Sequence, residues 1–248
     1  MSKQAEIEYL DRIGEAGRQH SLLKPFSNGD CGLTLASIGT IMALMPPPPA
    51  KVLDLGCGGG WSSTFFSRHG YDVLGQDISA DMICLAEETK LHNRAGDNLS
   101  FVVSDYETLK LKNEFDCAVF FDCLHHADDE CAALKSAFDA LKPGGIIITH
   151  EPGKGHSTNP HSIEAMELYG VNERDMPPQL IISQAERIGF CEPRIFPMQH
   201  DIFNYFYQSH PPKKLWSKSG IKFARRVLNL IFFPSLDASA IVTLRKPI

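Results

Sequence analysis

The sequence lacks the features that mark several large classes of protein. Its seven cysteines are scattered and none forms a Cys-x-x-Cys pair, so a reduced cytoplasmic protein with free thiols and no metal site is expected. A formal net charge of −6 gives no overall attraction to nucleic acid. No stretch is long and apolar enough to span a membrane. The N-terminus lacks the basic start and apolar run of a signal peptide.

A glycine-rich motif after a short apolar run is the strongest positive feature. Residues 52–55 predict a buried strand, and residues 62–68 predict a helix just beyond the glycines. This order lets a backbone approach a nucleotide closely, because a Cβ at the turn would block the ligand. The motif consists of Asp54, Gly56, Cys57, Gly58, Gly59, Gly60 and Trp61.

Two details of the motif favour one kind of cofactor over another. The dinucleotide fingerprint Gly-x-Gly-x-x-Gly needs a third glycine where this chain has Trp61. Asp54 suits a cofactor with a positive charge and an amino group better than it suits a pyrophosphate. Cys57 is interpreted as a small residue that fits the turn rather than as a nucleophile or a metal ligand.

Acidic residues follow the next two predicted strands. Asp77 ends the first of them and lies about 20 residues past the glycines, where a carboxylate can accept from both ribose hydroxyls. The alternative is that Asp77 caps the following helix, but Ser79 fits that cap at least as well. After the strand Phe101–Val103, Ser104-Asp105-Tyr106 would on its own predict only a turn.

The fourth predicted strand is continuously apolar from Ala118 to Phe121, as expected of a strand covered on both faces. It exits into Asp122-Cys-Leu-His-His126. A later helix ends in Ala140-Leu-Lys-Pro-Gly-Gly145, where proline stops the helix and a glycine supplies a positive φ. A fifth apolar strand, Ile146–His150, follows directly.

This ordered series resembles the class I S-adenosylmethionine-dependent methyltransferases over roughly residues 50–195. The Leu124-His125-His126 element looks most similar to the small-molecule branch that includes the ubiquinone-biosynthesis type. The resemblance implies an α/β fold with a Rossmann-like, doubly wound sheet in the order 3-2-1-4-5-7-6 and an antiparallel last strand. It implies S-adenosyl-L-methionine as cofactor, held by Asp54, Gly56, Cys57, Gly58, Trp61, Asp77, Ile78, Ser104, Asp105, Tyr106 and Asp122.

Length and composition fit one large domain, because 248 residues with 43% apolar content can bury a full core. Residues 1–49 are expected to form an N-terminal helical cap, with helices near Gln4–Gly17 and Leu33–Leu44. Residues 50–198 form the cofactor-binding core, and residues 239–248 hold the last strand.

Residues 199–238 form an insert before that strand, far longer than the usual hairpin loop. The favoured interpretation is a helix packed on the sheet with a solvated basic face. A substrate lid comes next, and a surface helix on anionic lipid is third. The aromatic and basic residues of the insert include Phe203, Tyr205, Phe206, Tyr207, Trp216, Phe223, Phe232, Phe233, Lys213, Lys214, Lys218, Lys222, Arg225 and Arg226.

Methyl transfer is an in-line displacement in which the protein mainly positions the acceptor and excludes water. An oxygen acceptor must also lose its proton, so a base with a pKa near neutrality helps. Each candidate base could instead support a loop or end a strand. His126 is preferred among the candidates at the carboxyl edge of the sheet, which are His125, His126, His150, Glu151 and His156, with Asp122 as a positioning carboxylate.

The sequence therefore predicts a methyltransferase for a small or medium-sized acceptor, at oxygen, with a metabolite, a sugar or glycan, and a lipid-like molecule all open. Two alternatives remain: an NAD-dependent oxidoreductase, disfavoured by Trp61 and Asp54, and a non-catalytic cofactor-binding family member. A DNA or protein methyltransferase is disfavoured because the Asn/Asp-Pro-Pro-Tyr/Phe signature is absent, the chain reading Asp122-Cys-Leu-His. The acceptor's identity and the oligomeric state stay open.

Overall fold

The computed structural model describes residues 2–204, 207, 214 and 216–248. At its centre lies a seven-stranded sheet in the order β3-β2-β1-β4-β5-β7-β6. β7 is antiparallel to both its neighbours, whereas the pairings among the first five strands are parallel. The predicted sheet order and the reversed last strand are therefore confirmed. The strands are β1 (Lys51–Leu55), β2 (Asp72–Asp77), β3 (Leu99–Val103), β4 (Phe115–Phe121), β5 (Leu141–Glu151), β6 (Cys191–Pro197) and β7 (Ala240–Arg245).

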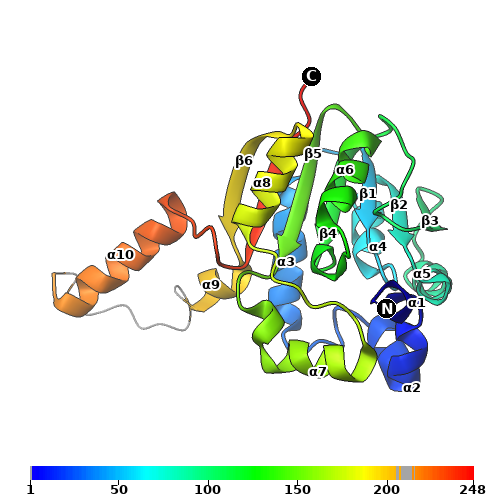
Figure 1. The fold of residues 1–248 in the computed structure, drawn as a ribbon, viewed down its shortest axis with the longest axis horizontal. Helices are drawn as coiled ribbons and strands as arrows, with labels where there is room; N and C mark the ends of the chain where they lie inside the picture. Colours follow the sequence, from blue (N-terminus) through cyan, green and yellow to red (C-terminus); the bar gives the residue numbers. More distant parts are fainter. Residues whose placement is uncertain (1, 205–206, 208–213, 215) are drawn as a thin grey trace.

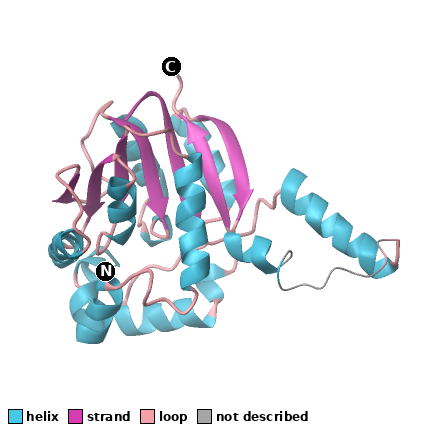
Figure 2. Ribbon diagram, turned by 180° about the vertical axis from the view of Figure 1, so that it is seen from behind, coloured by secondary structure: helices cyan, strands magenta, loops and turns pink. Residues whose placement is uncertain are grey.

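Helices cover both faces of this sheet (Figures 1 and 2). Side chains of α6 and α8 pack on one face and those of α3 and α4 pack on the other. The helices are α1 (Ser2–Ile7), α2 (Tyr9–Leu22), α3 (Cys31–Leu44), α4 (Trp61–Arg68), α5 (Ala80–His92), α6 (Glu130–Ala140), α7 (Pro160–Tyr169), α8 (Pro178–Ile188), α9 (Gln199–Phe203) and α10 (Lys218–Phe232), with short 3-10 turns η1 (Leu124–His126) and η2 (His156–Thr158).

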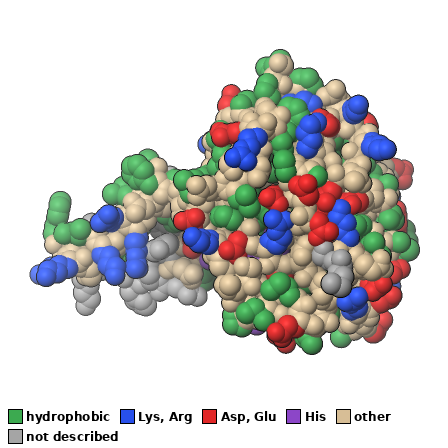
Figure 3. Space-filling model, viewed as in Figure 1, with side chains coloured by type: hydrophobic (Ala, Val, Ile, Leu, Met, Phe, Trp, Pro, Cys, Tyr) green, Lys and Arg blue, Asp and Glu red, His purple; other side chains and the backbone are tan. Residues whose placement is uncertain are grey.

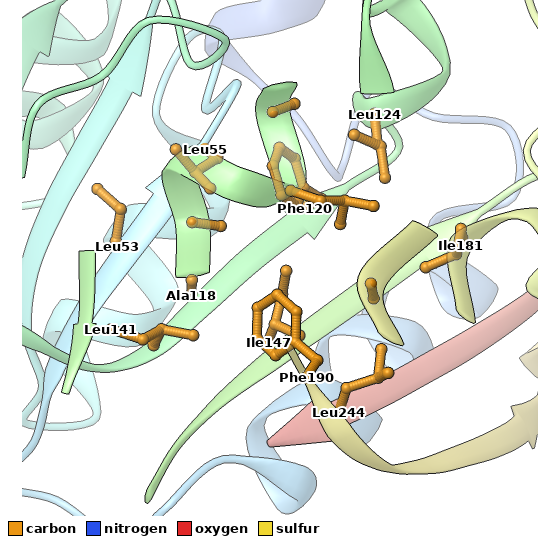
Figure 4. Close-up of a cluster of buried hydrophobic side chains, with 14 of the residues drawn as sticks. Leu53, Leu55, Ala118, Phe120, Leu124, Leu141, Ile147, Ile181, Phe190 and Leu244 are labelled. Carbon is orange, nitrogen blue, oxygen red and sulfur yellow. The ribbon is translucent and has the colours of Figure 1, made fainter. Parts of the chain in front are cut away.

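Strand β4 contributes apolar side chains to both faces of the sheet. Successive side chains of a strand point to opposite faces. Ala118 and Phe120 accordingly join the cluster under α6 and α8, part of which Figure 4 shows. Cys117 and Val119 join the cluster under α3 and α4. All four are fully buried, so this strand is fixed in the middle of the molecule and its exit is held in place by packing on both sides.

The N-terminal segment lies across the carboxyl-terminal edge of the parallel strands, together with α7 (Figure 1). The single helix predicted near Gln4–Gly17 is wrong in detail. The chain breaks between α1 and α2 at Glu8, and α2 kinks at Gly14, where φ is 64° and ψ is −166°. These breaks let the segment bend over the edge of the sheet instead of running past it. The second predicted helix is present as α3.

The insert before β7 does not form a helix packed on the sheet, so the favoured prediction is wrong for the described residues. Helix α10 projects from the body, and only its C-terminal end approaches β6 (Figure 1). The side chains of Ile221, Leu228 and Phe232 are 56%, 51% and 66% exposed. Within the described part of the chain, every helix is too short or too polar to cross a lipid bilayer. Tyr205, Phe206 and Lys213 lie outside the described residues.

Candidate functional site

A cavity of about 360 Å³ lies at the carboxyl-terminal edge of the sheet. Its volume falls in the range of small-molecule binding sites, and its place at the carboxyl ends of the strands is where open α/β sheets bind ligands. Segments far apart in the sequence meet around it: Gly56–Gly59 with Trp61, Asp77–Ile78, Asp105–Glu107, Phe121–Cys123 with His126, the N-terminal helices through Lys3, Glu6, Tyr9 and Ile13, and Val171 with Glu173.

The glycine turn needs its glycines for two different reasons. Gly56 has a φ of 64°, and a Cβ there would stand 2.8 Å from the Cβ of Cys123. Gly60 has a φ of 75°, and its Cβ would meet Ala86 and Phe101 at 2.8 Å. A left-handed backbone and close neighbours thus both exclude larger residues. The turn keeps Gly58 at the cavity, with open space where its Cβ would be.

Asp77 ties the glycine turn to the end of β2. Its Oδ2 accepts a hydrogen bond from the backbone N–H of Gly58 at 2.9 Å, and its Oδ1 accepts from the N–H of Ser79 at 2.9 Å. Ser79 is the N-cap of α5 and accepts from the N–H of Met82, as the sequence predicts. Asp77 therefore faces the cavity with its carboxylate oriented by two backbone donors, and each oxygen keeps a lone pair for a ligand.

Two predicted cofactor contacts lie behind the cavity rather than in its wall. The Asp54 side chain is 1% exposed, and its Oδ2 accepts from the hydroxyls of Ser62 at 2.7 Å and Ser63 at 2.6 Å. Burial raises its pKa to about 6, against the opposing effect of these two hydrogen bonds. Asp54 thus joins β1 to the first turn of α4. Ser104 is also outside the wall, and its buried Oγ has no partner.

The other predicted cofactor residues line the cavity. Asp105 and Tyr106 come from the end of β3, where Asp105 accepts from Lys3 Nζ at 2.7 Å and the Tyr106 hydroxyl donates to the carbonyl of Cys123 at 3.2 Å. Trp61 packs edge-on against Phe121 with ring centroids 5.3 Å apart. Gly56, Cys57, Gly58, Ile78 and Asp122 complete the set. Burial raises the pKa of the Cys57 thiol well above its ordinary value, which fits a turn residue and not a nucleophile.

Asp122 lines the cavity at the exit of β4. It follows β4 with a φ of 51°, a left-handed conformation that is uncommon for a residue other than glycine and recurs at functional sites. Its Oδ1 lies 2.9 Å from Nδ1 of His150. Burial alone would raise the pKa of Asp122, but the charge of His150 and its hydrogen bond lower it. The His150 ring is buried and stacks on Phe121, so His150 supports Asp122 from behind the cavity wall.

The two adjacent histidines of η1 have different surroundings. His125 is 5% exposed, and its Nδ1 lies 2.7 Å from Oε2 of Glu151. His126 lines the cavity, and its Nδ1 donates to the carbonyl of Asn172 at 2.5 Å. Burial and the neighbouring His125 lower the pKa of His126 to about 4. The His126 ring is therefore neutral near pH 7, with the Nε2 lone pair free.

Glu151 and His156, two further candidate bases, are not in the cavity wall. Glu151 is fully buried and accepts from the backbone N–H groups of Cys123 at 3.1 Å and Leu124 at 2.8 Å. It holds the exit of β4 in place. The Nε2 of His156 is 2.6 Å from Oε2 of Glu173, so His156 orients a carboxylate that does line the cavity.

Sequence reasoning missed two acidic residues that distant segments of the chain bring to this site. Glu173 lies in the loop after α7, and Glu6 lies on α1, where its Oε1 accepts from the N–H of Asn172 at 3.2 Å. Burial raises the pKa of Glu6 to about 7. The polar run 172–175 between two helices was the available signal for Glu173. Nothing in the local pattern around Glu6 distinguishes it from a surface residue of a helix.

Known proteins resemble this chain in sequence and in fold. A family model described as "Methyltransferase domain" matches residues 34–190. A ubiquinone biosynthesis O-methyltransferase of Xanthomonas axonopodis pv. citri (strain 306) is 32% identical over 111 residues, which cover 44% of this chain and 45% of that protein. The chain thus spans about half the length of this curated relative.

Solved structures share the fold at low sequence identity. Phosphoethanolamine N-methyltransferase 2 of Haemonchus contortus, in complex with S-adenosyl-L-methionine, superposes with a TM-score of 0.60 at 18% identity, covering 86% of this chain and 53% of that one. An S-adenosylmethionine-dependent methyltransferase from Mesorhizobium loti gives 0.58 at 18% identity, covering 84% and 96%.

The sheet order, the glycine turn with Asp77 at the cavity, and the family match over more than half of the chain agree with one another. They set aside a nicotinamide-dependent oxidoreductase and confirm the class predicted from the sequence. The chain belongs to the methyltransferase domain family and has the fold of the class I S-adenosylmethionine-dependent methyltransferases.

Proposed function

We propose that this protein transfers a methyl group from S-adenosyl-L-methionine to an oxygen atom of a small acceptor. The observation that carries the proposal is that the glycine turn, Asp77, Asp122 and His126 all line one cavity. The cofactor supplies an electrophilic methyl group on a sulfonium. The protein's task is then to bind both molecules in line and to exclude water.

The cofactor end fits an adenosine with a charged amino-acid tail. Asp77 offers two carboxylate oxygens to ribose hydroxyls, and Asp105 with Tyr106 offers an acceptor and an aromatic ring to adenine. Gly58 leaves room where a side chain would intrude. Several carboxylates in the cavity wall favour a cationic donor, namely Glu6, Asp77, Asp105, Glu107, Asp122 and Glu173.

The acceptor end carries groups that can take a proton. The acceptor's lone pair forms the new bond to the methyl carbon as the carbon–sulfur bond breaks, and the hydroxyl proton must pass to the protein or to water. His126 is the candidate base predicted from the sequence that lines the cavity, and Asp122, predicted as a positioning carboxylate, also lines it. We place the acceptor hydroxyl beside them, with His150 positioning Asp122 and the Asn172 carbonyl orienting His126.

Two measurements test this proposal. Isothermal titration calorimetry should show binding of S-adenosylmethionine and of its demethylated product, with NAD much weaker. Transfer of a labelled methyl group should then be measured with matched phenols, sugars and primary amines as acceptors. Transfer to hydroxyl compounds supports the proposal, and transfer only to amines overturns the choice of oxygen. Tight cofactor binding without transfer to a broad acceptor panel would favour the non-catalytic alternative.

We also propose that α10 contacts an anionic membrane surface. Its polar face carries Lys218, Lys222, Arg225 and Arg226 with no acidic residue, and its apolar face is uncovered over Ile221, Leu228 and Phe232. Figure 3 shows basic side chains gathered along this projecting helix. An amphipathic helix with a basic face and bulky apolar residues is suited to the lipid interface. No described insert residue lines the cofactor cavity, which disfavours the lid interpretation.

Vesicle flotation tests this second role. The intact protein should float with vesicles that contain phosphatidylserine and should sink with pure phosphatidylcholine, because each basic residue near an anionic surface contributes about 1 kcal/mol. Replacing the four basic residues with alanine should abolish flotation without changing cofactor binding. Equal flotation of that variant, or no flotation of the wild type, would refute the role.

A further inference from the structure

Two imidazoles and a carboxylate converge beside the cavity. Nitrogen or oxygen atoms of His125, His126 and Glu173 all lie within 4.8 Å of one another. His125 Nε2 is 3.6 Å from Oε2 of Glu173, too far for a hydrogen bond but close enough for a shared ligand between them. None of the three side chains is exposed, so this is not a surface group of acids.

The outer partners of the two histidines fix which nitrogen is free. His125 Nδ1 donates to Glu151 at 2.7 Å, and His126 Nδ1 donates to the Asn172 carbonyl at 2.5 Å. In a neutral ring, the other nitrogen, Nε2, then carries a lone pair. A histidine that binds a metal typically donates its second nitrogen to a carboxylate or to a backbone carbonyl, and both arrangements occur here.

These outer partners are themselves rigid. Glu151 is fully buried and is held by the backbone N–H groups of Cys123 and Leu124. Asn172 accepts at its carbonyl from His126, and its side-chain amide donates back to the His126 carbonyl at 3.1 Å. The Glu173 carboxylate is oriented by Nε2 of His156 at 2.6 Å. The three lone-pair donors are thus held in place before any ligand arrives.

We propose that His125, His126 and Glu173 bind one divalent transition-metal cation, with zinc as the best match. Two imidazoles and one carboxylate form a ligand set of catalytic zinc sites, which leave a fourth position open. His126 and Glu173 line the cavity, so that position faces the acceptor. Magnesium is a poor match because it prefers oxygen ligands. The sequence predicts no metal here, since the adjacent His125 and His126 and the distant Glu173 have no recognisable ligand spacing.

A cation at this point deepens the proposed function. Bound to the acceptor oxygen, it would lower the pKa of the acceptor hydroxyl and stabilise the oxyanion that forms as the proton passes to water. His126 would then act through the cation rather than take the proton itself. This role rests on the proposed methyl transfer to oxygen, whereas binding of the cation does not.

Metal titration of the chelator-treated protein is the direct test. Calorimetry should show one equivalent of Zn²⁺ bound at micromolar protein concentration, with no comparable binding of Mg²⁺. Co²⁺ should give the visible absorption of a low-coordinate site that Zn²⁺ then bleaches. Absence of stoichiometric Zn²⁺ and Co²⁺ binding would overturn the proposal. The space between His125 Nε2 and Glu173 would then hold a proton on His125 instead of a metal ion.

Variants separate the site from adventitious binding. Replacing a residue that only hydrogen-bonds to a metal ligand typically lowers metal affinity roughly 10–100-fold, and Glu151→Gln should lower the affinity for Zn²⁺ by that much. His126→Ala and Glu173→Gln, which remove ligands, should each lower it more. The matched control is His161→Ala, an exposed histidine on α7, which should bind Zn²⁺ as the wild type does. Retention of wild-type affinity in the His126→Ala, Glu173→Gln double variant would refute the assignment. Unchanged melting and cofactor binding show that each variant is folded.

Activity distinguishes this inference from the proposed function. If Zn²⁺ does not bind and methyl transfer continues in the presence of chelator, the proposed cation site is refuted and the methyltransferase proposal stands. If Zn²⁺ binds as expected but no hydroxyl acceptor is methylated, the cation site stands and its role at the acceptor oxygen fails.

Discussion

Replacing Asp77 with alanine should weaken cofactor binding more than any other single change in the cavity wall. In the structure, its carboxylate receives hydrogen bonds from the N–H groups of Gly58 and Ser79, both at 2.9 Å, and faces the cavity. The two oxygens are thereby oriented for a ligand without the cost of ordering them on binding. Alanine removes both the ligand contacts and the bond that ties the glycine turn to β2.

The magnitude follows from the number of hydrogen bonds lost. A pair of ribose hydroxyls donating to one carboxylate contributes about 2–3 kcal/mol in net terms. That loss corresponds to a rise of roughly 30- to 150-fold in the Kd for S-adenosylmethionine. Asp77→Asn should lie between the wild type and Asp77→Ala, because an amide keeps only one accepting oxygen.

Calorimetry with S-adenosylmethionine and S-adenosylhomocysteine measures the effect. The matched control is Asp81→Ala, which removes an exposed carboxylate from the first turn of α5, outside this cavity. A folded Asp77→Ala variant with a Kd within threefold of the wild type would refute the assignment of Asp77 to the ribose. An equal loss in Asp81→Ala would show that the effect comes from general electrostatics.

Three further predictions follow from the structure. Burial raises the pKa of Asp54 to about 6 from an ordinary 3.8, so its contribution to stability is greatest below pH 4 and declines as pH rises to 6. Between these pH values the wild type should therefore lose on the order of 2–3 kcal/mol of unfolding free energy relative to Asp54→Asn, measured in urea. A difference that stays constant with pH would contradict this prediction. His126→Ala should lower turnover by about 10²–10⁴-fold with unchanged cofactor affinity, while His161→Ala keeps full activity; full activity in alanine variants at 125, 126, 150 and 156 would exclude a histidine role. Deleting residues 201–235 should preserve cofactor binding by calorimetry, since no described insert residue lines the cavity; loss of binding in a folded product would disprove this.

The sequence predicted the sheet through the family resemblance, and it located the glycine turn and Asp77 because their signals are local. Strand, glycine turn and helix are consecutive in residues 51–68, and the acid that ends β2 follows within one further unit. Gly56 and Gly60 have positive φ values in the structure, as a glycine-rich turn requires. Ser79 was recognised as a cap from its position before a helix, and this local rule also proved correct.

Other predictions failed where burial, not pattern, decides what a side chain does. Asp54 stands in the cofactor motif, but its carboxylate is satisfied by two serines of α4 and is closed off from the cavity. The helical periodicity of the insert correctly predicted α10, yet it could not show that α10 projects from the body. An amphipathic pattern indicates that one face of a helix is apolar, but it does not identify the surface against which that face is buried.

The sequence by itself located the glycine turn and the acid that ends β2, because these signals are local, and its resemblance to the class I methyltransferases implied the family and the order of the strands. Only the tertiary structure decided which further residues gather at and behind the cavity wall. There, Glu6 meets Asn172 across 166 residues, Lys3 meets Asp105 across 102, and Glu151 meets His125 across 26. Such pairs depend on how loops and terminal helices pack over the edge of the sheet. That packing brings His125, His126 and Glu173 together, although no spacing in the chain marks them as a set.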